Sequence, residues 1–173
     1  MRKLMLLVVC LLMTAGAYAQ SIVGQWVQTS KDSEDGNEMT LSEVFTVSDG
    51  GAFDDVIDMV FKMKDKKKDK NADAKDDSNA FRFKINCKGS WSLENGMFTR
   101  TYDVNTLRME VLGIPEGKSK FATKMFAKFI YAGFKTEART PERYKLISLT
   151  SDELVLQSTD PDDPGNTTFT RKK

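Results

Sequence analysis

The chain has 173 residues, with 26 Lys and Arg against 25 Asp and Glu, and it contains no histidine. Its length suits one domain, and its nearly balanced charge does not indicate nucleic-acid binding. The lack of histidine excludes a Ser-His-Asp triad and removes the commonest general base and metal ligand. We therefore expect no enzymatic activity, no catalytic residue, no metal site and no cofactor.

The first 19 residues have the pattern of a secretory signal peptide. Arg2 and Lys3 precede an apolar run over residues 4–13, and the small-x-small motif Ala17-Tyr18-Ala19 follows. The run is shorter than the roughly 20 residues that cross a bilayer. We expect cleavage after Ala19 and export to the periplasm or the outside of the cell. Cys87 is then the only cysteine of a mature chain over residues 20–173, so no intramolecular disulfide can form.

Most of the mature chain alternates apolar and polar residues, which is typical of half-buried strands. The pattern predicts eight strands, which cover residues 22–29, 39–47, 53–63, 80–91, the stretch after Asn95-Gly96, and residues 144–150, 153–158 and 167–171. Glycines at the turns, such as Gly50 and Gly51, supply the positive φ that hairpins require. Eight antiparallel strands predict an all-β up-and-down barrel, which is large enough to hold one small ligand.

The alternation also predicts which side chains share a face of each strand. On residues 80–91 the shared face carries Phe81, Phe83, Ile85 and Cys87. On residues 53–63 it carries Phe53, Ile57, Met59, Phe61 and Met63. After the Asn95-Gly96 turn, Phe98 and Tyr102 share a face with Arg100. Cys87 is accordingly predicted to be a small buried side chain and not a reactive thiol.

Residues 64–80 interrupt the strand pattern. They contain almost no apolar side chain and mix both charges, so they cannot bury enough surface to become ordered. We interpret this segment as a mobile charged loop between two strands.

Residues 118–135 form the second exception and predict an amphipathic helix between the fifth and sixth strands. Its apolar positions are Phe121, Met125, Phe126, Phe129, Ile130 and Phe134, and its lysines are Lys118, Lys120, Lys124, Lys128 and Lys135. Two interpretations remain open. The apolar face packs on the barrel as core, or the helix contacts anionic lipid at a membrane surface or covers a ligand.

The two ends of the mature chain resemble the lipocalin (calycin) family. Gly24-Gln25-Trp26 matches its G-x-W signature, and Arg171 matches the basic residue of its last strand. The resemblance implies a barrel lock in which Arg171 lies across the Trp26 indole beside Gly24, so that residues 20–173 form one lipocalin-like domain. The stretches "GSWSLENGMFTRTYD" and "YKLISLTSDELVLQS" are similar to small secreted bacterial lipocalin-like proteins of unknown function. The charged segment and the inserted helix depart from the family pattern.

Two classes of function follow from a lipocalin-like barrel. The first is an exported carrier that holds a small apolar or amphipathic ligand. In this hypothesis the ligand contacts Phe81, Phe83, Phe98 and Tyr102, and the helix caps it with Phe121, Met125, Phe129 and Ile130. Arg100 offers a counter-charge to an acidic head group, unless it faces solvent beyond the strand's end. The second class is a structural or protein-interaction module of the envelope with a filled barrel. A barrel lumen of about 300 Å³ or more would favour the carrier over this module.

Overall fold

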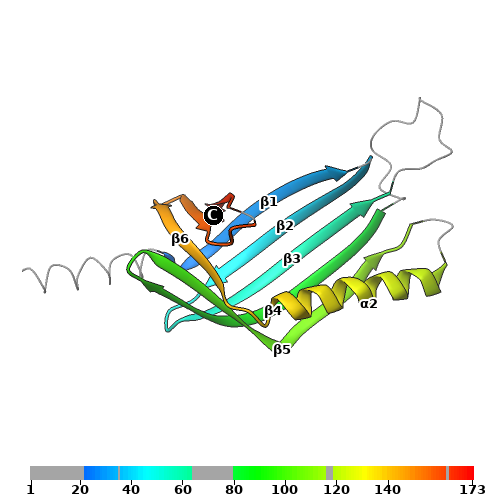
Figure 1. Ribbon diagram of the computed structural model, residues 1–173, viewed down its shortest axis with the longest axis horizontal. Helices are drawn as coiled ribbons and strands as arrows, with labels where there is room; N and C mark the ends of the chain where they lie inside the picture. Colours follow the sequence, from blue (N-terminus) through cyan, green and yellow to red (C-terminus); the bar gives the residue numbers. More distant parts are fainter. Residues whose placement is uncertain (1–21, 35, 64–79, 116–118, 163) are drawn as a thin grey trace, which may run out of the picture.

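The computed structural model describes residues 22–34, 36–63, 80–115, 119–162 and 164–173 (Figure 1). The predicted signal peptide and residues 64–79 of the predicted charged loop lie outside the described residues. The strands are β1 (Gly24–Glu34), β2 (Asn37–Val47), β3 (Ala52–Lys62), β4 (Ala80–Glu94), β5 (Met97–Gly113), β6 (Glu142–Leu149), β7 (Glu153–Ser158) and β8 (Asn166–Arg171), and the helix is α2 (Lys120–Glu137).

The strands pair in chain order, each antiparallel to the next, and β1 pairs with β8 to close the barrel. This confirms the predicted all-β up-and-down barrel with one helix between the fifth and sixth strands. Within the described residues, no helix has both the length and the apolar character that crossing a membrane requires.

Several strands are longer than predicted. Strands β1 and β2 continue to a tight turn at Gly36, β4 runs to Glu94, and β8 begins at Asn166. Strand β5, whose end was not predicted, runs to Gly113. The additional residues of β1 are mostly exposed polar side chains, so no apolar alternation marks them. Their backbone groups nevertheless pair with the neighbouring strand, because hydrogen bonding between strands does not require a buried face.

Strands close the barrel at only one end. Strands β6 to β8 are short, and β5 pairs with β6 only from Met97 to Arg100. The core of this closed end consists of Ile22, Trp26, Phe45, Val47, Phe53, Phe98, Leu154, Leu156 and Phe169, all at most 2% exposed. Beyond it, α2 runs alongside β4 and β5 (Figure 1). A second core of Met59, Phe81, Phe83 and Ala127 lies there, with Phe126, Ile130 and Phe134 packed against it.

The predicted lock joins the first and last strands of the closed end. The Arg171 guanidinium lies 4.2 Å from the centroid of the Trp26 ring, and its Nη1 donates to the Val23 carbonyl at 2.9 Å. Gly24 has a φ of 141°, and a Cβ there would overlap Arg171 Nη1. Trp26 Nε1 donates to the Ile22 carbonyl at 2.7 Å. The cation–π contact that the resemblance implies is therefore present, and Gly24 leaves room for it.

The helix packs on the barrel through only part of its predicted apolar face. Phe121, Met125 and Phe129 are 73%, 53% and 75% exposed, so the expectation that they cover the lumen is wrong. Of the four predicted capping residues, only Ile130 packs against the core. Residues 121, 125 and 129 form one stripe along the helix, and residues 126, 130 and 134 form another. The small Ala127 borders the second stripe and is 8% exposed, which lets this side approach the sheet closely.

Candidate functional site

The barrel interior contains a cluster of charged side chains where the closed end meets the end covered by α2. Alternation along β2 points Glu43 inward with Phe45, and alternation along β3 points Asp55 inward with Phe53. Arg100 points inward from β5 and is 6% exposed. The expectation that Arg100 lies on an inner face is confirmed, and the alternative that it faces solvent is wrong.

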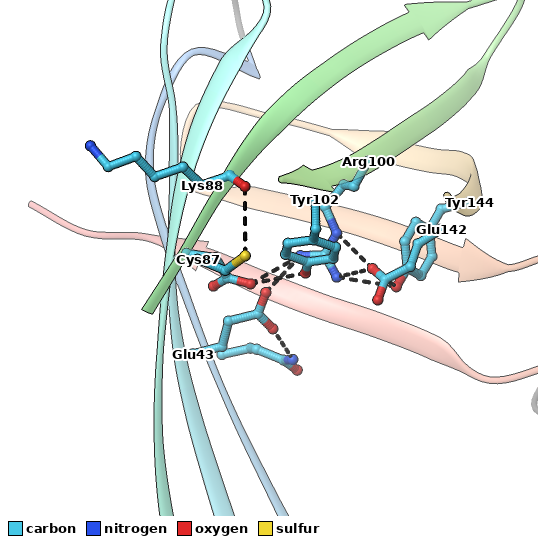
Figure 2. A network of polar contacts seen from close by, with 9 residues as sticks. Glu43, Cys87, Lys88, Arg100, Tyr102, Glu142 and Tyr144 are labelled. Carbon is cyan, nitrogen blue, oxygen red and sulfur yellow. Dashed lines mark hydrogen bonds and ion pairs between the residues drawn. The ribbon is translucent and has the colours of Figure 1, made fainter. Parts of the chain in front are cut away.

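Each nitrogen of the Arg100 guanidinium contacts an acceptor (Figure 2). Nη1 reaches across the barrel to Glu43 Oε1 at 2.7 Å, and Nε donates to Glu142 Oε2 at 2.9 Å. Nη2 lies 2.6 Å from the same Glu142 oxygen and donates to the Tyr144 hydroxyl at 3.1 Å. Glu142 is the residue opposite Arg100 in the pairing of β6 with β5. The guanidinium thus joins β5 to β2, a strand that is not its neighbour in the barrel.

Aromatic rings surround the guanidinium and keep water away. Its central carbon lies 5.0 Å from the centroid of the Phe45 ring, 5.6 Å from that of Tyr102 and 5.3 Å from that of Tyr144. Burial disfavours the charged form, but the facing Tyr102 and Glu43 raise the pKa of Arg100 well above its usual value. Burial also raises the pKa of Tyr144 to about 12. Arg100 therefore stays cationic, and the Tyr144 hydroxyl keeps its proton.

Asp55 is the acidic residue of the cluster whose hydrogen bonding is incomplete. Its Oδ2 accepts from the Tyr102 hydroxyl at 3.0 Å and lies 3.9 Å from Arg100 Nη1. Its Oδ1 is buried and has no hydrogen-bond partner in the part of the chain that the structure describes, and the residue is only 2% exposed. Burial, and then the nearby Glu43, raise the pKa of Asp55 to about 8. At neutral pH this side chain is therefore mostly protonated.

A cavity of about 110 Å³ borders Asp55, Arg100 and Tyr102. Apolar side chains form much of its remaining wall, and they are Ile57, Ile85, Leu107 and Phe134. Residues from the C-terminal end of α2 complete the wall, so the helix covers part of the cavity. The cavity is smaller than the lumen of about 300 Å³ that would favour a carrier. It holds at most a molecule of a few heavy atoms, since an apolar cavity of about 150 Å³ accommodates benzene.

Cys87 also borders this cavity and is 7% exposed. Burial raises the pKa of its thiol, which keeps the sulfur protonated and weakly nucleophilic. This agrees with the predicted small buried side chain. Among the described residues, no three side chains of the usual ligand types are placed to hold a metal ion.

The predicted ligand-contacting residues divide into three groups. Arg100 and Tyr102 border the cavity. Phe98 belongs to the core of the closed end. Phe81 and Phe83 lie against α2, with ring centroids 5.1 and 5.8 Å from that of Phe126. The structure therefore does not gather these side chains around one space.

Three acidic residues of the cluster and Tyr144 were not predicted from sequence. For Asp55 and Glu43, the sequence contained a signal of burial in the barrel interior. Asp55 lies between Phe53 and Ile57 at the spacing of the inner face, and Glu43 stands two residues before Phe45. A charged residue in an alternating apolar series is buried with a partner. Glu142 had no such signal, because it stands at the first position of β6.

Neither the models of known protein families nor the curated protein sequences match this chain.

Proposed function

We propose that this chain is an exported, lipocalin-like binding protein that holds a small amphipathic ligand in the cavity beside Asp55. The observation that carries the proposal is the buried carboxyl group of Asp55, a residue that borders the cavity and whose Oδ1 has no hydrogen-bond partner among the described residues. A buried polar atom without a partner costs about 1–3 kcal/mol, and a bound hydrogen-bonding group would recover that cost. The signal-peptide pattern and the Gly24, Trp26 and Arg171 lock support an exported lipocalin-like barrel.

The ligand's polar group is a hydrogen-bond donor, best an ammonium group. The acidic head group of our sequence hypothesis does not suit the site, because Glu43 and Glu142 already occupy the Arg100 guanidinium. Three carboxyl groups surround this single guanidinium. Glu43 and Glu142 already exceed the single positive charge of the guanidinium, so a further negative charge would be repelled in this buried place. An ammonium group would balance the excess of acid and favour the ionised form of Asp55. The apolar wall receives the ligand's short carbon chain.

The test compares three ligands that share a four-carbon chain: butylamine, butanol and butyrate. We expect butylamine to raise the melting temperature of the protein, with butanol weaker and butyrate inactive. A ligand at 100 times its Kd stabilises the fold by about 2.7 kcal/mol, which thermal unfolding resolves. Reaction of the Cys87 thiol with a disulfide reagent gives a second measure, because an occupied cavity slows it.

Two variants identify the group that binds. Asp55→Asn should weaken butylamine binding at least tenfold. Asp54→Asn is the matched control, because Asp54 adjoins Asp55 but points outward and has a side chain 52% exposed. An equal loss in both variants, or no binding of any of the three compounds at tens of millimolar, would refute the proposal.

The second class of function, an interaction module with a filled barrel, is supported by the closed end. Its core side chains are almost completely buried and fill the interior there. This function predicts that small ligands leave the melting temperature unchanged and that an outer surface contacts a partner.

A further inference from the structure

The outward side of α2 carries a row of apolar side chains over three successive turns. We call Phe121, Met125 and Phe129 the outer stripe, and each is more than half exposed. Single exposed apolar residues are common on protein surfaces, but a contiguous row of large ones marks an interaction site. Leu112 and Ile114, which shortly precede the helix, are 56% and 44% exposed. The molecule thus exposes apolar groups on and just before α2.

Positive charge accompanies the outer stripe. Lys124 and Lys128 are exposed and each directly precedes a stripe residue, which places them along one side of it. The only acidic residue in the helix sequence is Glu137 at its last position. The inward side of α2 is already occupied by the barrel core, so the outer stripe is not needed to hold the helix in place.

We infer that the outer stripe docks on the surface of an anionic lipid bilayer. An amphipathic helix lies in a bilayer interface when it has large apolar side chains on one face and lysines beside them. Phe121, Met125 and Phe129 would enter the boundary between head groups and acyl chains. Lys124 and Lys128 would extend toward the lipid phosphates, since long lysine side chains keep their charge in the polar layer.

The charge of the helix favours lipid over a second copy of this chain. Two copies that met through their outer stripes would bring Lys124 and Lys128 of each copy near the same lysines of the other, without acidic residues between them. An anionic bilayer supplies the opposite charge along the whole row. The inference is independent of the ligand proposed for the barrel cavity.

The experiment is flotation of the purified exported protein with vesicles. We expect binding to phosphatidylcholine vesicles that contain 30% phosphatidylglycerol, and at least tenfold weaker binding to pure phosphatidylcholine. The double variant Phe121→Gln/Phe129→Gln should reduce binding to the anionic vesicles at least tenfold, and glutamine preserves helix propensity. Lys124→Gln/Lys128→Gln should abolish the difference between the two kinds of vesicle.

The matched control is Met97→Thr/Ile147→Thr, which removes two exposed apolar side chains from β5 and β6, at 37% and 47% exposure. It should bind anionic vesicles as the unmodified protein does. Equal binding by the control and the phenylalanine variant, or no binding to anionic vesicles, would overturn the inference. Self-association that the phenylalanine variant abolishes, without vesicle binding, would overturn it in favour of a dimer surface. Melting temperatures establish that every variant is folded.

Discussion

Replacing Arg100 with Met tests whether the buried charge cluster holds the barrel together. Met keeps an unbranched apolar chain but removes the contacts of the guanidinium with Glu43, Glu142 and Tyr144. Among the described residues, the Glu43 side chain, 8% exposed, would then keep the amide of Gln28, which donates at 2.6 Å. Removing one partner of a buried ion pair costs about 3–5 kcal/mol. We expect the free energy of unfolding to fall by that amount.

Urea denaturation of single and double variants measures this effect. Glu43→Gln alone should cost less than Arg100→Met, because Arg100 keeps Glu142, whose side chain is 34% exposed and hydrated. Arg100→Met/Glu43→Gln should be more stable than the sum of the single changes predicts, with a coupling energy of about 2 kcal/mol. The coupling is favourable because Glu43→Gln removes the buried charge that Arg100→Met leaves without a partner.

An exposed ion pair of similar length is the control. Lys88 Nζ lies 3.1 Å from Asp54 Oδ1, with side chains 69% and 52% exposed. Exposed pairs contribute about 0–1 kcal/mol, so Lys88→Met should change stability little. The reasoning from burial is refuted if Arg100→Met costs no more than Lys88→Met, or if the effects at Arg100 and Glu43 are additive.

Three further predictions concern stability. Trp26→Ala should lower the free energy of unfolding by about 3–5 kcal/mol, the scale for a large buried aromatic side chain. Arg171→Ala should lower it by less. An unchanged melting temperature in Trp26→Ala would contradict the barrel lock. The raised pKa of Asp55 lets the folded chain hold a proton between pH 3.8 and about 8 that the unfolded chain has released. Stability should therefore fall as pH rises through this window, by about 1 kcal/mol per pH unit, and Asp55→Asn should flatten the dependence seen by calorimetry. Replacing residues 64–79 with Asn-Gly should preserve cooperative unfolding, because β3 and β4 already pair at their ends. The entropy cost of closing a loop also depends only weakly on its length. Loss of the cooperative transition would show that the segment is structural.

The local pattern of the sequence by itself determined the barrel strands. Alternation of apolar and polar residues marked the strands, and glycine marked turns such as those at Gly50 and Gly96, whose φ values are positive. The barrel lock was also predictable from the resemblance to lipocalins. Gly24, Trp26 and Arg171 stand at the positions that are characteristic of the lock, near the two ends of the mature chain. These features depend on the preferences of short segments, which a single sequence displays directly.

Only the tertiary structure decided which side chains form the cluster in the interior. Glu43 and Arg100 are 57 positions apart and lie on strands that are not neighbours, so their contact depends on the closure and register of the whole barrel. The tertiary structure also decided how α2 packs, because its sequence contains two apolar stripes with equal spacing. Periodicity identifies a helix with an apolar face, but the shape of the surface beneath it selects the stripe that is buried, and here that surface is assembled from β3, β4 and β5.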